Sequence, residues 1–403
     1  MTTVPVDRWL TSRQACERLG VRPQTLYAYV SRGLLASVTH DGRSRYDPEQ
    51  VATLAQRTAR GRRPGRFEVT IDTEITRIER QGRLSYRGVA IEDLVGRWSF
   101  ERTAAWLWTG IDRGEPERPW TPDPERVRAA VAAQTGLPDD IAPGARLRVA
   151  LAAIGAGPAP TPADGDPRGP EAARATIATL VAALPVIGPA PTGARRGSVA
   201  AQLWARVSPR PARPAGVALL DATLVALADH ELATSTLGVR VATSTGAGLE
   251  AALLAGLATL SGPLHGAAAE PVRAMLVDAR RRGAVAAIDA ATTRGGWVPG
   301  VGHTVYEEVD PRTALLLGRL EGVASPRRRA VVDAVVAELR RRRLAPLNAD
   351  LALGAVLDAG GLVTGSAEVV FAVARTAGWV AHAREESRHR LRYRARALYT
   401  GPR

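Results

Sequence analysis

The sequence predicts a mainly α-helical protein of two or three folding units. A chain of 403 residues is long enough for a large buried core, and 45% of its residues are hydrophobic. Aromatic residues contribute only 4%, so Ala, Leu and Val must fill most of the interior. Because Ala is the best helix former and Leu is among the better ones, this composition favours close-packed helices.

The sequence also argues against several other classes of protein. Pro, Gly or a charge interrupts every apolar run before about 18 residues, so no transmembrane helix is expected. The N-terminal residues MTTVPVDRWL lack the basic and apolar regions of a signal peptide. A single cysteine, Cys16, excludes an internal disulfide framework and a multi-cysteine metal site. We expect a cytoplasmic protein without a metal centre.

Positive charge is concentrated near the N-terminus. All 54 basic residues are Arg, and the formal net charge is +14. Residues 1–66 hold 12 Arg against 5 acidic residues, whereas residues 67–403 hold 42 against 35. The first sixth of the chain thus carries half of the excess charge, which indicates a polyanionic partner.

Residues 1–60 have the pattern of two short helices followed by a hairpin. Thr11 with Gln14 predicts a capping box at the start of the first helix. Gly20 predicts the turn, and Pro23 suits the first position of the second helix. Farther on, Asp-Gly between two β-prone segments predicts a β-hairpin.

This pattern resembles the winged helix-turn-helix of the MerR and excisionase type. In those proteins the second helix enters the major groove and the wing touches the DNA backbone. Duplex DNA is the partner that the resemblance implies, and a small helical protein-interaction module is the alternative. The candidate DNA-binding residues on the second helix and the hairpin are Arg22, Gln24, Thr25, Tyr29, Arg32, Arg43 and Arg45.

A basic linker over residues 61–67 separates this module from the rest of the chain. It lies along DNA phosphates or serves as a solvated spacer, and the sequence leaves both open. Short β-prone pieces, broken by Gly82 and Gly88, follow it. From Phe100 onward the pattern is mostly helical, with Pro-rich breaks between the helices.

Three of the six histidines, His230, His265 and His303, lie in unusual contexts. Gly and Pro residues around His265 predict a sharp loop that feeds a helix. The partial positive charge of a helix N-terminus would keep that imidazole neutral. Two glycines just before His303 allow its backbone to approach a ligand closely. A structural role for each histidine is the alternative, and spacing alone does not define a reaction.

Seven motifs follow one another along residues 69–403. They are DTEITRIERQGRLSYRGVAIEDL, DHELATST, GPLHG, GVGHTVYEEVDPR, LNADLALG, FAVARTAGW and RARALYTG. In their order and spacing they resemble the citrate synthase family, whose bacterial members include proteins with a helix-turn-helix ahead of this domain. The resemblance implies a large helical domain over residues 68–233 and 347–403 and a small helical domain over residues 234–346.

The resemblance also implies a reaction, the condensation of acetyl-CoA with oxaloacetate to give citrate and CoA. Asp350 would remove a methyl proton, His265 would donate a hydrogen bond to the enolate, and His303 would polarise the ketone. The implied substrate-binding residues are His230, Arg312, Arg375 and Arg394, the last supplied across a homodimer interface. The implied partners are oxaloacetate and a short acyl-CoA, with no cofactor.

These roles agree with the chemistry of the side chains. The carbon next to a thioester is a weak acid, which needs a carboxylate base and hydrogen-bond donors for the enolate. Arg binds carboxylates with two parallel hydrogen bonds. Without the resemblance, Asp350 is better explained as a helix cap and Arg312 as a surface ion-pair partner, and Arg394 also fits an ordinary charged helix face. Arg375 lies in an apolar run, so it requires a partner.

The sequence departs from the family's pattern around these residues. Thr304 stands where the family often has a basic residue, and Glu307 stands where Lys is common. The further departures are Ala233, Ala267, Ala269, Leu351 and Ala352. They leave open a 2-methylcitrate synthase that uses propionyl-CoA, a DNA-binding transcription regulator with a dimeric metabolite-sensing domain, and an inactive subunit that regulates a paralogue.

Overall fold

The computed structural model divides the chain into two compact units, Met1–Asp72 and Thr73–Arg403. The structure describes residues 9–19, 21, 23, 26, 29–30, 35–48, 50–51, 70–79, 82–157, 165–193, 195–263, 265–307, 310–344, 346–389 and 393–394. Each unit has hydrophobic core residues of its own. None of the helices in these ranges is long and apolar enough to cross a bilayer.

The N-terminal unit combines helical turns with a three-stranded antiparallel sheet in the order β1-β3-β2. The predicted capping box is confirmed, because Thr11 N–H donates to Gln14 Oε1 over 2.9 Å and Gln14 N–H donates to Thr11 Oγ1 over 3.3 Å. The elements with described bounds are β1 (Leu10–Thr11), α1 (Ser12–Leu19), β2 (Ser37–His40) and β3 (Arg43–Tyr46).

The hairpin predicted in this unit is confirmed as β2 and β3. Its two turn residues, Asp41 and Gly42, have φ angles of 49° and 71°. Two consecutive positive φ angles match the twist of the flanking strands in a two-residue hairpin turn. The core beneath the hairpin consists of Leu10, Ala15, Leu19, Leu26, Leu35, Tyr46 and Val51.

The C-terminal unit begins with a small antiparallel sheet and is otherwise helical, which confirms the predicted mainly α fold. Gly82 and Gly88, with φ of 90° and 84°, form the turns of this sheet. The strands are β4 (Thr76–Glu79), β5 (Arg83–Tyr86) and β6 (Val89–Ala90). The helices that precede His230 in this unit are α4 (Ile91–Leu94), α5 (Phe100–Thr109), α6 (Pro124–Ala132), α7 (Pro143–Ala156), α8 (Pro170–Ala182), α9 (Val199–Val207) and α10 (Pro214–Leu227).

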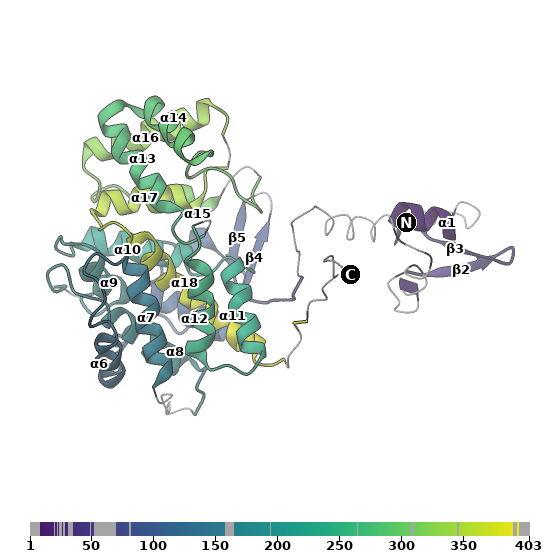
Figure 1. The fold of residues 1–403 in the computed structure, drawn as a ribbon, viewed down its shortest axis with the longest axis horizontal. Coiled ribbons are helices and arrows are strands. Elements are labelled where there is room, and N and C mark those ends of the chain that lie inside the picture. Colours follow the sequence, from purple (N-terminus) through teal and green to yellow (C-terminus); the bar gives the residue numbers. More distant parts are fainter. Residues whose placement is uncertain are drawn as a thin grey trace, which may run out of the picture. The chain divides into compact units, whose positions relative to one another are not determined.

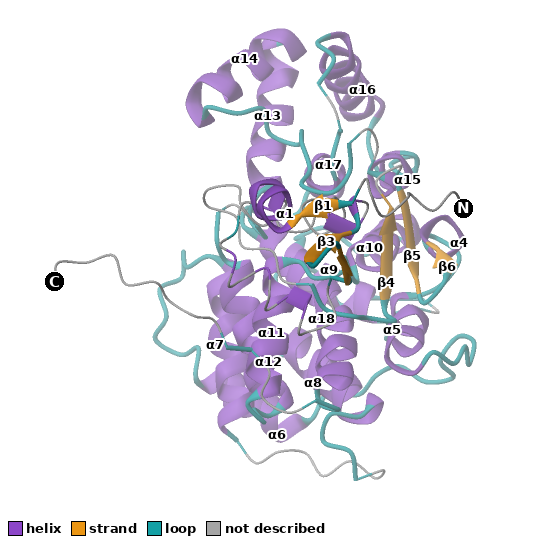
Figure 2. Ribbon diagram, turned by 90° about the vertical axis from the view of Figure 1, so that its right-hand side faces the viewer, coloured by secondary structure: helices purple, strands orange, loops and turns teal. Residues whose placement is uncertain are grey.

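The remaining helices complete two hydrophobic cores. The first core includes Phe100, Leu224 and Val373, and the second core includes Met275, Ile288 and Val335. They are α11 (Thr234–Ser244), α12 (Leu249–Leu260), α13 (Ala269–Arg282), α14 (Ala284–Gly295), α15 (Pro311–Leu317), α16 (Pro326–Arg341), α17 (Ala349–Gly360) and α18 (Ser366–Glu386). Helix α18 runs through the first core and packs against α5, α10, α11 and α12 (Figure 1). The second core lies among α13, α14, α16 and one face of α17, and Figure 2 shows the first three helices gathered at one end of the unit.

The packing bears on the predicted division into a large and a small helical domain. Helices α11 and α12 contribute Val239, Leu253 and Leu257 to the first core, together with α18. Helices α11 and α12, which fall within the predicted small domain, therefore share a core with α18 of the predicted large domain. Since the compact units divide only at Asp72, the predicted limits of the two helical domains stay a prediction.

Candidate active site

The loop that carries His303 is fastened to the segment that starts α17. Gly302 N–H donates to the carbonyl of Pro346 over 2.8 Å, and Asn348 N–H donates to the carbonyl of Gly300 over 3.0 Å. The Asn348 side chain donates to the carbonyl of Gly302 over 2.9 Å. These bonds join segments 46 residues apart and bring His303 to the N-terminal end of α17, where the predicted base lies.

Two backbone N–H groups hold the ring of His303. Those of Val305 and Tyr306 donate to its Nδ1 over 3.0 and 3.2 Å. A ring nitrogen that accepts these bonds carries no proton, so the neutral ring is protonated at Nε2. Burial, followed by the positive charge of Arg312, lowers the pKa of His303 to about 4. At neutral pH this side chain is an uncharged hydrogen-bond donor.

His230 is buried next to His303. Their ring centroids lie 5.1 Å apart, and His230 Nε2 lies 3.2 Å from the Tyr306 hydroxyl. Burial lowers the pKa of His230 well below its usual value, and the charges of Arg312 and Arg375 lower it further. The His230 ring is therefore also neutral, in a cluster with two buried cations.

His265 lies in a turn before α13, and its Nε2 is 2.9 Å from the hydroxyl of Ser235. The edge of its ring faces Phe371, with centroids 5.7 Å apart. Its pKa is lowered to about 4 by burial first and by the charge of Arg375 second. The neutral state predicted from the sequence is thus present, but burial is its main cause, since α13 begins only at Ala269.

Asp350 occupies the first turn of α17 without capping it. The N-cap is Asn348, whose side chain accepts hydrogen bonds from the N–H groups of Asp350 and Leu351. Burial raises the pKa of Asp350 to about 6, although the charge of Arg312 opposes the rise. The alternative of a helix cap is therefore excluded, and the carboxylate is free to accept a proton near neutral pH.

Arg312 forms a buried ion pair rather than a surface one. Its Nε and Nη2 donate to the two oxygens of Asp310 over 2.9 and 2.7 Å. The same carboxylate accepts a hydrogen bond from the N–H of Ala349, at the start of α17. Asp310 thereby fixes both the guanidinium and the helix that carries Asp350.

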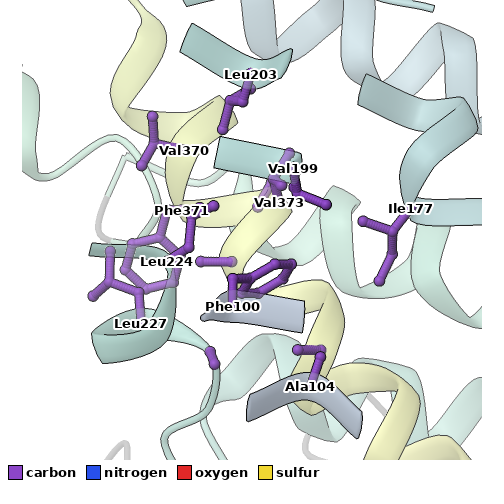
Figure 3. Close-up of a cluster of buried hydrophobic side chains, with 14 of the residues drawn as sticks. Phe100, Ala104, Ile177, Val199, Leu203, Leu224, Leu227, Val370, Phe371 and Val373 are labelled. Atoms are coloured by element: carbon purple, nitrogen blue, oxygen red, sulfur yellow. The ribbon is translucent and has the colours of Figure 1, made fainter. Parts of the chain in front are cut away.

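Arg375 lies in the middle of α18 and is 1% exposed. Its Nε donates to the carbonyl of Leu227 over 2.9 Å, and its guanidinium lies 4.8 Å from the ring centroid of Phe371. Leu227 and Phe371 lie close together at the edge of the apolar cluster in Figure 3. Among the described residues Nη1 has no hydrogen-bond partner, and burial lowers the pKa of Arg375 to about 10. A buried cation with an unused donor fits an anionic ligand.

The structure brings most of the residues predicted for chemistry and substrate binding into one cluster. The charge of Arg375 lowers the pKa of both His230 and His265, and the charge of Arg312 lowers that of Asp350. Arg394 is exposed beyond α18, and none of the described interactions joins it to this cluster. The described residues contain no group of His, Cys, Asp or Glu that would hold a metal ion.

Three members of the cluster were missed in the sequence: Ser235, Tyr306 and Asp310. The Asp-Pro-Arg sequence was a usable signal for Asp310, because Asp before Pro is a typical N-cap and first helical residue. The residues that the hydroxyls of Ser235 and Tyr306 contact are 30 and 76 residues away, so no local pattern pointed to these two contacts.

The predicted DNA-binding residues are only partly described. Arg22, Gln24, Thr25 and Arg32 lie outside the described residues. Tyr29 was expected on a polar face, but its ring packs partly against the small core. Arg43 is exposed and Arg45 half-buried on β3, the return strand of the hairpin, as expected.

Three uncharged histidines, a carboxylate with a raised pKa and two buried arginines define a site for an anionic ligand and proton transfer. The family model "Citrate synthase, C-terminal domain" matches residues 67–396, and a helix-turn-helix domain model matches residues 9–59. The chain belongs to the citrate synthase family.

Individual relatives agree with this assignment. "Putative citrate synthase 2" of Mycobacterium tuberculosis is 36% identical over 47% of this chain, and the chain spans only 52% of that protein's length. "2-methylcitrate synthase" of the same species is 27% identical over 79% of this chain and 84% of the relative. The crystal structure of citrate synthase from Pyrobaculum aerophilum aligns with a TM-score of 0.67 and 27% identity over 83% of this chain and 91% of its own.

Proposed function

We propose that the protein condenses a short acyl-CoA with oxaloacetate by citrate synthase-type chemistry and releases free CoA. The observation that carries the proposal is the cluster itself, which combines a carboxylate with a raised pKa, three neutral histidines and two buried arginines. No other part of the described chain combines a base, neutral donors and cations in this way. Family membership adds to this support.

In the proposed mechanism Asp350 removes a proton from the carbon next to the thioester. The forming enolate oxygen receives a hydrogen bond from neutral His265, whose pKa of about 4 keeps it uncharged. A neutral donor is suited to this step because the N–H of a neutral imidazole is closer in acidity to the enol than the N–H of an imidazolium is. The enolate carbon then attacks the ketone, whose oxygen accepts a hydrogen bond from His303 Nε2–H and takes up a proton to become a hydroxyl. Water then hydrolyses the thioester bond of the condensation product, which releases free CoA and leaves a carboxylate.

The carboxylates of oxaloacetate would bind to Arg312, Arg375 and His230. The unused Nη1 of Arg375 supplies one donor, and the low exposure of both guanidiniums strengthens their attraction for an anion. We propose that Arg394, which is exposed, completes the site of a second copy in a homodimer. The condensation requires no cofactor besides its two substrates.

Release of free thiol tests this function directly. Acetyl-CoA and propionyl-CoA are each mixed with oxaloacetate, and thiol is measured for the wild type and for Asp350→Asn. The wild type is expected to release CoA with at least one of them, and the ratio of the two kcat/KM values identifies the acyl group. Absence of release with every short acyl-CoA would overturn the proposal.

The hairpin of the N-terminal unit favours a second function, binding of duplex DNA. Arg43 and Arg45 lie on its return strand, β3, within the residues 9–59 that match the helix-turn-helix domain model. Arg side chains on such a wing would neutralise DNA phosphates and release counterions, so affinity would fall steeply with salt.

Duplex binding measured against salt concentration tests this second function. Replacing both Arg43 and Arg45 by Ala is expected to weaken binding and to reduce the salt slope by about two. Removal of residues 1–60 is expected to abolish binding. A truncated protein that binds DNA as the full chain does would rule out the N-terminal unit as the DNA reader.

A further inference from the structure

Tyr306 contacts both histidines of the proposed ketone and carboxylate site. Its ring centroid lies 4.6 Å from that of His303 and 5.5 Å from that of His230. Its hydroxyl is 3.2 Å from His230 Nε2, and its backbone N–H donates to His303 Nδ1 over 3.2 Å. The side chain is 1% exposed, so these contacts are shielded from water. One residue therefore touches one nitrogen of each ring.

The Tyr306 hydroxyl is the hydrogen-bond partner of His230 Nε2 that the structure describes, over 3.2 Å. A neutral imidazole has one proton, so a hydroxyl that donates to Nε2 leaves the ring proton on Nδ1. Burial raises the pKa of Tyr306, so its hydroxyl keeps a proton to donate.

The proton of His303 is placed on the opposite ring nitrogen. Nδ1 of His303 accepts from the N–H groups of Val305 and Tyr306, which leaves the proton on Nε2. With the Tyr306 hydroxyl as the donor to His230, the two neighbouring histidines carry their protons on different ring nitrogens. The Tyr306 side chain determines the first arrangement, and the Tyr306 backbone contributes to the second.

We propose that Tyr306 is a positioning residue that sets the tautomers of both histidines, His230 through its hydroxyl and His303 through its backbone N–H. The tautomers fix which ring nitrogens donate and which accept before a ligand binds. The catalytic consequence rests on the proposed condensation, but the tautomers themselves can be measured without turnover.

Tyr306→Phe separates the two effects because it removes the hydroxyl and keeps the backbone N–H. The full-length protein is labelled with ¹⁵N-histidine, and long-range ¹H–¹⁵N spectra are recorded near neutral pH. The resonances of His230 and His303 are assigned with single His→Gln variants. In Tyr306→Phe the His230 proton is expected to redistribute toward Nε2, whereas His303 is expected to stay protonated at Nε2 and to serve as an internal control.

Tyr86→Phe is the matched control for loss of a buried hydroxyl. Tyr86 is fully buried, and its hydroxyl bonds the backbone of Asp229 rather than a ring nitrogen. This variant is expected to leave the His230 tautomer unchanged. An unchanged His230 tautomer in Tyr306→Phe, or a change of equal size in Tyr86→Phe, would overturn the proposal.

Ligand binding provides the functional test. Loss of one ordering hydrogen bond is expected to weaken oxaloacetate binding to Tyr306→Phe by about two- to tenfold. The expected kinetic signature is a raised KM for oxaloacetate with a smaller change in kcat. If the wild type shows no thiol release at all, the proposed function fails, while the tautomer measurement still decides the role of Tyr306.

Discussion

At the scale of single residues, the raised pKa of Asp350 sets the pH range in which the site works. The base must be ionised, and its pKa is about 6, so the rate is expected to fall as pH decreases through about 6. His265 and His303, with pKa values of about 4, stay neutral over this interval and do not contribute to the fall. The measurement is kcat/KM as a function of pH, which reports the pKa values of the free enzyme.

Asp350→Asn is the control for this pH dependence. Removing a general base is expected to lower kcat by about 10² to 10⁴ and to abolish the acidic limb of the profile. A wild-type rate that stays constant well below the pKa of Asp350 would contradict the assignment of this residue as the base.

At Arg375, ligand affinity and protein stability are expected to respond differently to the same substitution. Arg375→Met retains much of the side-chain volume but removes a buried cation whose Nη1 has no partner among the described residues. Oxaloacetate affinity is expected to fall by about 2–5 kcal/mol, as measured by calorimetry. The ligand-free variant is expected to keep or raise its Tm, because the pKa of Arg375, lowered to about 10 mainly by burial, indicates that the bond to Leu227 and the charge of Asp229 offset only part of the cost of burying the guanidinium. A lower Tm in ligand-free Arg375→Met would show that the guanidinium stabilises the fold.

At the scale of elements, the pairing of the His303 loop with α17 should determine catalytic geometry. Gly300 has a φ of 81°, and a Cβ there would lie 2.9 Å from the Cβ and 3.1 Å from the Cα of Leu351. Gly300→Ala is expected to destabilise the protein by about 1–3 kcal/mol. It is also expected to lower kcat, because the loop must move away from Asp350. Urea unfolding and steady-state kinetics measure the two effects.

Gly283→Ala is the matched control for this element. Gly283 has a φ of 83°, but a Cβ there would have no heavy atom within 4 Å. It lies between α13 and α14, so the variant is expected to lose stability through backbone strain alone, with kcat unchanged. Equal loss of kcat in both variants would refute the special role of the Gly300 contact.

The elements also show which features can be predicted from a sequence. The capping box of α1, the Asp-Gly hairpin and the glycine loops depend on near neighbours in the chain, and the sequence was sufficient for them. The polar face assigned to Tyr29 was not, because tertiary packing draws its ring against the small core. Asn348, two residues before Asp350, is the N-cap of α17, so the residue that rules out Asp350 as the cap was visible in the sequence.

The site itself was predictable in its main residues only through the ordered family motifs. Local chemistry indicated two unusual histidine loops but not which residues they contact. The bonds that join them to their surroundings, such as Val301 with Leu347 and His265 with Ser235, link segments far apart in the chain. Such contacts depend on the packing of helices, which composition and periodicity do not specify.

At the scale of the whole molecule, the question is whether each site needs two copies of the chain. Arg394 is exposed and lies outside the cluster, and we propose that it acts in the site of a partner subunit. Asp350 and Arg394 would then belong to different sites of one dimer. In a heterodimer of an Asp350→Asn chain and an Arg394→Ala chain, one site would carry both changes and the other neither.

Co-expression with two different affinity tags would isolate that heterodimer. Since a two-fold dimer has two equivalent sites, its activity is expected to be about half that of the wild type, although each parent homodimer is nearly inactive. If Arg394 acts within its own chain, every site keeps one change and no activity returns. The control heterodimer pairs Asp350→Asn with His303→Gln; both residues lie in one cluster of one chain, so it is expected to stay inactive. Activity in the control would indicate contamination by wild-type chains or residual activity of one variant, whereas recovery confined to the Arg394 pair would establish a shared site.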